Sequence, residues 1–248
     1  MFWLLLLMVI APSIGLTTFF YLRDRYEPEP KGHVARAFLY GLLVFVPAFW
    51  LGGAVGELVS AEFLALGGLR AELYHAFLMV ALPEEAVKMA LFASTILMWD
   101  ELDEPFDGIV YGVALALGFA TLENVAYVAR AYLEGELPVR VAALRAVLAV
   151  PAHAIYGAVQ GYYLGSAKMS RRKAYKVVAP AAGFVLSWIF HAGYDMACTL
   201  VGPLWGWLLL GTMSASMWLF VLLLLPRALR ESPFRPRRVR GSHDLRED

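Results

Sequence analysis

Ionisable side chains recur within stretches of the chain that are otherwise strongly apolar. They are Glu84, Glu85, Lys88, Glu123, Arg145, His153, His191 and Asp195, with the carboxamide of Asn124 next to one of them. Carboxylates and imidazoles transfer protons, activate water and bind metal ions. An ionisable group near the centre of a bilayer costs at least about 2.5–3.5 kcal/mol on insertion scales. We therefore expect these residues to form a polar interior that serves a chemical purpose.

The most concentrated group is Glu84-Glu85-Ala86-Val87-Lys88. On a helix, Lys88 lies four residues from Glu84 and three from Glu85, so one ammonium can balance both carboxylates. The two glutamates point about 100° apart and are expected to have different roles. Carboxylates this close repel each other, so one should bind a proton more tightly, which suits general acid–base catalysis. A purely structural Glu–Lys ion pair is the alternative.

Five later residues add a carboxamide, two more carboxylates and two imidazoles. Asn124 could donate to an oxyanion and Glu123 could bind a histidine or a metal, although ordinary hydrogen bonding between helices is the alternative. His191 and Asp195 are four residues apart on one helix face, so the carboxylate can orient the imidazole or bind a ligand beside it. His153 taken alone is equally consistent with a hydrogen-bonded packing residue.

The composition indicates the environment in which these residues must lie. The chain has 248 residues, of which 60% are hydrophobic and 17% charged, and its mean hydropathy is +0.62. A soluble domain of this size could not bury that much apolar surface in one core. The formal net charge is +0, so bulk charge gives no reason to expect a nucleic-acid partner. The single cysteine, Cys198, excludes an internal disulfide and a cysteine-based metal site.

Seven apolar segments are long enough to cross a membrane as helices. They cover about residues 2–22, 34–56, 73–98, 107–133, 140–166, 174–200 and 204–225. The fold class that we predict is therefore all-α, a polytopic transmembrane helical bundle of about seven spans. The segment from Leu58 to Glu72 is expected to hold a short interfacial helix, and the first apolar run is expected to be a retained span, since it lacks the basic start of a secretory signal.

The distribution of basic residues predicts the orientation of the bundle. Most of them fall in residues 23–36, 168–176 and 227–246, and seven spans place these segments on one side. The positive-inside rule makes that side cytoplasmic, with the N-terminus outside the plasma membrane and the C-terminus inside. Residues 1–226 would form one transmembrane domain, and residues 227–248 an Arg-rich cytoplasmic tail that is disordered or lies against anionic headgroups.

Depth along the spans favours a single site. At about 1.5 Å per residue, Glu84 lies halfway through its span and Glu123 and His153 lie near the middle of theirs. His191 and Asp195 lie in the outer half. Unrelated buried pairs would have little reason to reach overlapping depths, so we expect one shared site.

The motifs, taken together, resemble those of the PrsW family of intramembrane proteases, which are related to CAAX prenyl endopeptidases and bacteriocin-immunity-type membrane proteases. The resemblance covers about residues 34–200. Its positions are Glu84-Glu85-x-x-Lys88, Asp107-Gly108-x-x-Tyr111-Gly112, Gly118-Phe119-Ala120-x-x-Glu123-Asn124, His153 and His191-x-x-x-Asp195.

The resemblance implies hydrolysis of a peptide bond in a membrane-anchored protein, near the extracytoplasmic half of the bilayer. The best-known role in that family is site-1 cleavage of an anti-sigma factor. Glu84, Glu85, His153 and His191 would be catalytic, with Lys88, Glu123, Asn124 and Asp195 in support. The expected partners are the protein substrate and the lipid bilayer, and the sequence gives no oligomeric state.

Two mechanisms fit these residues. In the favoured one, Glu84 or Glu85 activates water directly and no metal is used. A histidine or Asn124 then stabilises the oxyanion. In the other, His153, His191 and a carboxylate, either Glu123 or Asp195, hold Zn²⁺ while a glutamate of the pair deprotonates the water.

One other functional class competes with a protease. Chains of intramembrane Glu, His and Asp also mark proton-coupled transporters and ion relays. The sequence has no visible internal repeat, and its ionisable groups cluster in depth rather than forming a ladder across the bilayer. A membrane scaffold would leave the buried carboxylates unexplained.

Overall fold

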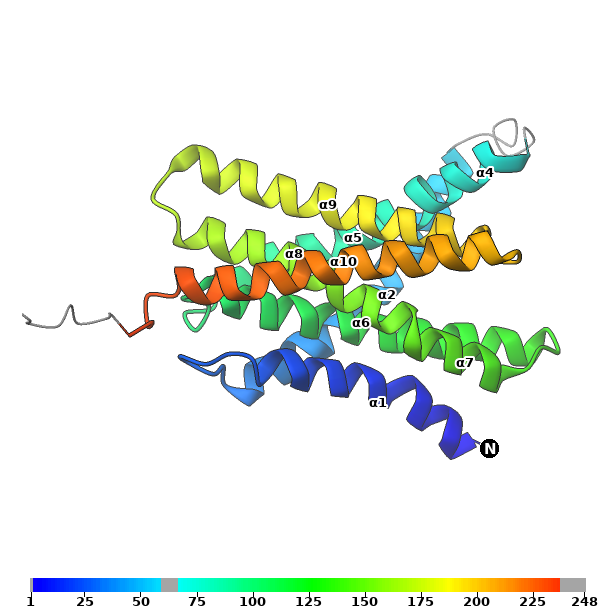
Figure 1. Cartoon of the computed structure of the whole chain (residues 1–248), viewed down its shortest axis with the longest axis horizontal. Coiled ribbons are helices and arrows are strands. Elements are labelled where there is room, and N and C mark those ends of the chain that lie inside the picture. Colours follow the sequence, from blue (N-terminus) through cyan, green and yellow to red (C-terminus); the bar gives the residue numbers. More distant parts are fainter. Residues whose placement is uncertain (1, 59–66, 237–248) are drawn as a thin grey trace, which may run out of the picture.

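The computed structural model describes residues 2–58 and 67–236, and this part of the chain is a bundle of helices without strands (Figure 1). The long helices are α1 (Phe2–Tyr21), α2 (Lys31–Leu58), α6 (Pro105–Leu133), α8 (Ala149–Met169), α9 (Lys173–Thr199) and α10 (Leu204–Glu231). The shorter elements are α4 (Gly68–Tyr74), the π-helix η1 (His75–Ala81), α5 (Leu82–Ser94), the 3₁₀ turn η2 (Ile96–Met98) and α7 (Pro138–Val147). The predicted all-α bundle is confirmed.

The predicted spans correspond to helices of the structure within a few residues. Six helical stretches are long and apolar enough to cross a membrane, with α7 and α8 forming one of them over Pro138–Met169. The remaining passage is composite, because α4, η1 and α5 follow one another without a break over residues 68–94. Residues 59–66, where part of the expected interfacial helix falls, lie outside the described residues.

The π-helix η1 directly precedes the glutamate pair. Pro83, near the start of α5, has no N–H to donate to the turn before it. The chain widens there instead, so that the Leu82 amide reaches back to the carbonyl of Phe77. The Trp188 indole of α9 donates to the same carbonyl at 2.7 Å. This widened turn fixes the direction in which the first residues of α5 face the bundle.

Helix α6 is the centre of the bundle. Inside the protein, 83% of its most apolar stretch is buried, against 17% for α1 and for α2. Large side chains that remain exposed on the outer helices, such as Phe49 and Trp50 of α2, are then available to lipid. The strongly buried α6 carries Glu123 and Asn124 into the interior.

Glycines allow α6 and α8 to pack with their backbones in contact. A side chain at Gly108 or Gly112 of α6 would overlap the carbonyls of Gly161 or Gly157 of α8. Small residues four apart are the usual device for close helix approach in membranes. The Asp107-Gly108-x-x-Tyr111-Gly112 motif thus has a packing role, which brings α8 close enough for His153 to face α6.

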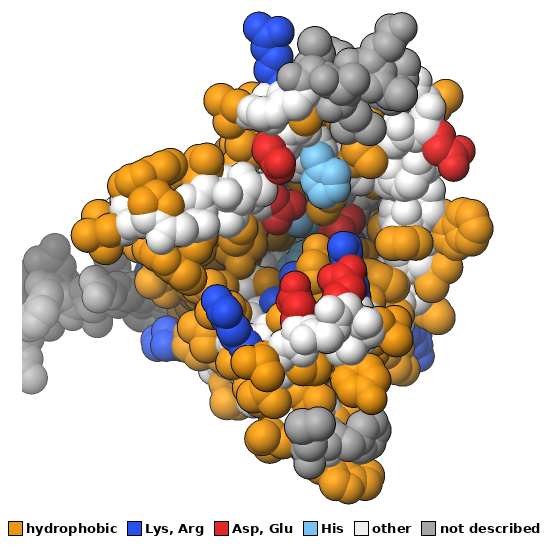
Figure 2. All heavy atoms as spheres, turned by 90° about the vertical axis from the view of Figure 1, so that its right-hand side faces the viewer, with side chains coloured by type: hydrophobic (Ala, Val, Ile, Leu, Met, Phe, Trp, Pro, Cys, Tyr) orange, Lys and Arg blue, Asp and Glu red, His pale blue; other side chains and the backbone are white. Residues whose placement is uncertain are grey.

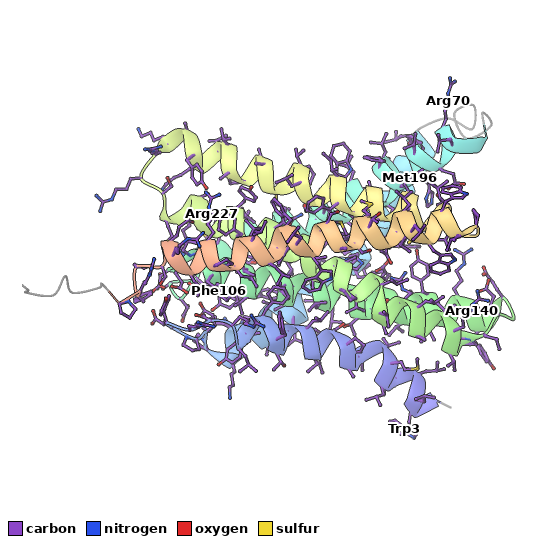
Figure 3. The ribbon with its side chains drawn as sticks, in the orientation of Figure 1. Trp3, Arg70, Phe106, Arg140, Met196 and Arg227 are labelled. Carbon is purple, nitrogen blue, oxygen red and sulfur yellow. The ribbon has the colours of Figure 1, made fainter. Side chains whose placement is uncertain are left out.

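The connections that carry the basic segments lie at one end of the bundle. In Figure 1 the α1–α2 connection, the α8–α9 connection and the C-terminal end of α10 are on the left. Figure 3 places Arg227 toward that end, and Trp3, Arg70 and Arg140 at the opposite end. Helix α10 continues past Pro226 to Glu231, so the first residues of the expected tail are helical; residues 237–248 lie outside the described part of the chain.

Candidate active site

Glu85 is the most heavily bonded carboxylate of the site. Its Oε1 lies 2.5 Å from the Lys88 ammonium and 2.8 Å from Nδ1 of His191. Its Oε2 accepts a hydrogen bond from the Gln160 carboxamide at 2.9 Å. Glu85 and Lys88 are almost fully buried, with exposed fractions of 1% and 2%. Glu85 therefore holds His191 in place and has no free oxygen for a substrate.

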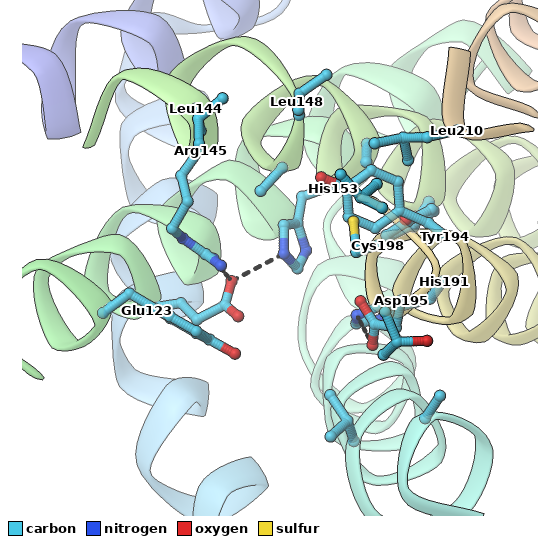
Figure 4. A pocket seen from close by; sticks show the side chains of 18 of the residues that line it. Glu123, Leu144, Arg145, Leu148, His153, His191, Tyr194, Asp195, Cys198 and Leu210 are labelled. Atoms are coloured by element: carbon cyan, nitrogen blue, oxygen red, sulfur yellow. Dashed lines mark hydrogen bonds and ion pairs between the residues drawn. The ribbon is translucent and has the colours of Figure 1, made fainter. Parts of the chain in front are cut away.

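Glu123 holds the second imidazole in the same way. Its Oε2 lies 2.9 Å from Nε2 of His153 and 2.7 Å from Nη2 of Arg145. The Arg145 Nε donates to the Asn124 side-chain oxygen at 2.6 Å, and its guanidinium stacks on the Tyr127 ring at 3.8 Å. Figure 4 shows this chain of contacts from Arg145 through Glu123 to His153. Asn124 is thus occupied in positioning Arg145.

Three further ligand atoms lie close together, and two of them are buried without a hydrogen bond. They belong to Glu84, His153 and His191, and one donor atom of each lies within 4.8 Å of the other two. Glu84 Oε2 and His153 Nδ1 receive no hydrogen bond although both are buried. The remaining ring nitrogen of His191, Nε2, lies 3.8 Å from Glu84 Oε2 and 3.6 Å from Asp195 Oδ2.

This donor set fits a divalent transition metal. Two imidazoles and one carboxylate are the ligands of many catalytic zinc sites. Each imidazole has a carboxylate at its other nitrogen, Glu123 for His153 and Glu85 for His191, which fixes the ring and raises the basicity of the nitrogen that faces the site. Glu84 takes the place that the sequence assigns to Glu123 or Asp195 in the metal-dependent scheme.

The site lies between two cavities. One, of about 380 Å³, is lined by Arg145, His153, Tyr156, His191 and Asp195 among others. The other, of about 310 Å³, lies on the α2 side and is lined by Glu84, Glu123, His75 and Arg130 among others. Figure 2, a view of the end opposite the basic connections, shows acidic, basic and histidine side chains gathered in a hollow that hydrophobic side chains surround. The site is therefore reached from that end.

Several residues of the site were not identified from the sequence. Tyr156 stacks on His191 with ring centroids 4.8 Å apart, and its buried hydroxyl has no hydrogen-bond partner. The Gln160 side chain of α8 donates hydrogen bonds to Glu85 of α5 and to Ser187 of α9. Tyr156 and Gln160 lie three and seven residues after His153, on the same face of α8, which is the only signal that the sequence offered.

The structure brings the residues of the predicted single site together from four helices. Glu84, Glu85 and Lys88 come from α5, Glu123 and Asn124 from α6, His153 from α8, and His191 and Asp195 from α9. Glu85 bonds to Lys88 and His191, and Glu123 bonds to His153, with Asn124 joined through Arg145. The rings of His153 and His191 lie 5.3 Å apart, and Glu84 and Asp195 approach His191 at 3.8 and 3.6 Å. Their catalytic roles remain predictions.

Comparison with known proteins shows the family of the chain. The sequence model described as "PrsW family intramembrane metalloprotease" matches residues 29–225. The chain belongs to the PrsW family. It is similar to "Protease PrsW" of Geobacillus kaustophilus, with 36% identity over 84% of this chain and 85% of that protein. The "Protease PrsW" of Bacillus subtilis is 34% identical over 77% of this chain and 80% of its own length. No solved structure matches the chain.

Membership of the PrsW family decides between the functional classes that the sequence left open. The chain is an integral membrane protein and an intramembrane protease rather than a transporter. Its substrate is accordingly a protein, and the bilayer surrounds its helices. The family description names metalloproteases, so a metal ion is possible. Glu84, His153 and His191 are the residues that could bind it.

Proposed function

We propose that this PrsW-family protease is metal-dependent and that Glu84, His153 and His191 hold the ion. The observation that carries the proposal is the convergence of three ligand atoms that the surrounding network leaves free. From the sequence alone, water activated directly by a glutamate without a metal is favoured, and that prediction is untested. Both oxygens of Glu85 are engaged, and the free oxygen of Glu84 lies with ring nitrogens of His153 and His191 as one ligand set, which is why we prefer the metal-dependent alternative.

Each residue of the site then has a definite task. A zinc ion held there would supply a Lewis acid that polarises the scissile carbonyl and lowers the pKa of water. Asp195, whose side chain is 27% exposed and borders the larger cavity, accepts the proton of the attacking water at Oδ2. Tyr156 donates its free hydroxyl to the oxygen that develops negative charge. Glu85 and Glu123 orient the two imidazoles.

The substrate class follows from where the cavities open. We infer that a segment of a membrane-anchored protein lies across the two cavities, with its scissile bond beside Glu84. The basic connections at the far end support an orientation in the plasma membrane with the N-terminus outside and the C-terminus cytoplasmic. The site then opens toward the extracytoplasmic side. A membrane-anchored anti-sigma factor cut at site 1 is the first substrate to test.

Mapping the cut in a single-span substrate tests this function. Purified protease is mixed in liposomes with a one-span protein that carries different tags at its two ends, and mass spectrometry identifies the new termini. We expect cleavage in the extracytoplasmic half of the span or just beyond it, because the cavities open at that end. Cleavage at the cytoplasmic boundary would refute the orientation, and an intact substrate with every membrane-anchored candidate would refute the substrate class.

A further inference from the structure

A second group of buried acids lies away from the proposed catalytic site, where the α1–α2 connection meets the start of α6. One carboxylate oxygen of each of Asp24, Glu29 and Asp107 lies within 4.8 Å of the other two. All three side chains are buried, with exposed fractions of 5%, 4% and 1%. Phe106, which precedes Asp107, marks this end of the bundle in Figure 3. The proposed hydrolysis uses none of these carboxylates.

The contacts of this group leave its negative charge uncompensated. Asp107 Oδ2 accepts the backbone N–H groups of Asp103 and Glu104 at 2.9 and 2.6 Å, while its Oδ1 receives no hydrogen bond. The Tyr111 hydroxyl donates to the Glu29 carboxylate. Within residues 2–58 and 67–236, no lysine or arginine forms an ion pair with any of these acids.

Two neighbouring charged groups complete the surroundings. Glu104 is fully buried, with an exposed fraction of 0%, and its carboxylate caps the first turn of α6. Glu104 thus adds a fourth acidic side chain, next to Asp24. Lys168 of α8 is the cation that acts on this region, but its ammonium donates to the Trp99 carbonyl at 2.5 Å.

Protonation is one way to neutralise such a group and a bound cation is the other. Burial raises the pKa of Asp24 to about 6, that of Glu29 to about 7 and that of Glu104 to about 7. An uncompensated buried ion costs several kcal/mol. The donor atoms are all carboxylate oxygens, which are the ligands of hard cations such as Mg²⁺ and Ca²⁺.

We propose that Asp24, Glu29 and Asp107 bind a hard divalent cation, Mg²⁺ or Ca²⁺. The ion would fasten the α1–α2 connection to the first turn of α6, and so tie α1 and α2 to the central helix. The site differs in chemistry from the proposed catalytic centre, which offers two imidazole nitrogens. It also gives Asp107 and Tyr111 of the family motif a role besides helix packing.

Terbium luminescence provides a direct test with the whole protein. The Tyr111 ring lies 5.1 Å from the Trp99 ring, and its hydroxyl contacts Glu29, so light absorbed by these two side chains would excite a Tb³⁺ ion at the site. With chelator-treated protein at pH 7.5 we expect saturable emission that Ca²⁺ or Mg²⁺ displaces. Glu29→Gln and Asp24→Asn should each weaken Tb³⁺ binding at least about tenfold. Glu27→Gln, in the same connection but exposed, should leave it unchanged.

Two further measurements complete the test. Emission should persist in Glu84→Gln, since the catalytic site lies elsewhere, and Ca²⁺ or Mg²⁺ should raise the melting temperature of the wild type but not of Glu29→Gln. Wild-type protein that shows no saturable emission with millimolar Tb³⁺ would overturn the proposal and favour protonated carboxyl groups. Equal emission from Glu29→Gln, Asp24→Asn and the wild type would overturn it as well.

Discussion

Replacing Glu84 by glutamine is expected to lower the rate of peptide hydrolysis by about 10³-fold or more, while the chelator-treated variant stays as stable as chelator-treated wild type. The change keeps the shape of the side chain and removes the anionic ligand atom. Glu84 Oε2 has no hydrogen bond to lose, so the fold does not depend on its charge. The measurements are turnover of a peptide substrate and thermal unfolding of the same preparation.

The neighbouring variant Glu85→Gln should behave differently. It leaves the Lys88 ammonium buried without its counter-ion and removes the acceptor of His191, so both stability and activity should fall. Asp195→Asn should lose activity by about 10²–10⁴-fold but keep its metal. Glu134→Gln, in the exposed Arg130–Glu134 pair, is the matched control. Normal turnover in Glu84→Gln, or stability losses of equal size in both glutamate variants, would contradict the division of roles.

Replacing Lys88 by methionine is expected to destabilise the protein by about 3–5 kcal/mol, because removing one partner of a buried pair strands the other charge. The Lys88 ammonium lies 2.5 Å from Glu85 and 4.5 Å from the centre of the Phe119 ring, with 2% of the side chain exposed. Denaturant or thermal unfolding of the purified protein measures the change.

A double-mutant cycle separates the pair from the single residues. If the two charges stabilise each other, Lys88→Met combined with Glu85→Gln should cost clearly less than the sum of the single changes. Arg130→Met breaks an exposed ion pair, whose side chains are 72% and 48% exposed, and should leave stability close to that of the wild type. Additive losses in the Lys88–Glu85 cycle would show that the lysine acts independently of the glutamate.

Much of the fold could be predicted because membrane helices follow from length and apolarity alone. The spans of α1, α2, α6, α9 and α10 were located within a few residues, apart from the extension of α10 to Glu231. The composite passage over residues 68–94 was located less well, because the π-helical turn before Pro83 depends on tertiary contacts such as that of Trp188 with Phe77. No local sequence pattern encodes such a contact.

The sequence predicts which residues share the site, but it does not predict which of them form hydrogen bonds and ion pairs with one another. Spacing along a helix shows that Glu84, Glu85 and Lys88 share a region, and it cannot show which glutamate receives the lysine, Gln160 and His191. The same limit applies to Glu123, which lies behind His153 together with Arg145 rather than beside the free ring nitrogens. These choices depend on the crossing of α5, α6, α8 and α9, of which the glycine contacts set only the approach of α6 to α8.

The metal content of active protein tests the central proposal most directly. Purified protease is analysed by inductively coupled plasma mass spectrometry, with transition metals counted separately from Mg²⁺ and Ca²⁺, while turnover is followed during stepwise removal of metal by a chelator. We expect one transition-metal ion per chain, activity that falls in proportion to its loss and returns with Zn²⁺, and metal-poor protein in the Glu84→Gln variant. Full turnover of wild-type protein that holds no stoichiometric transition metal would contradict the proposed centre and restore hydrolysis by glutamate-activated water.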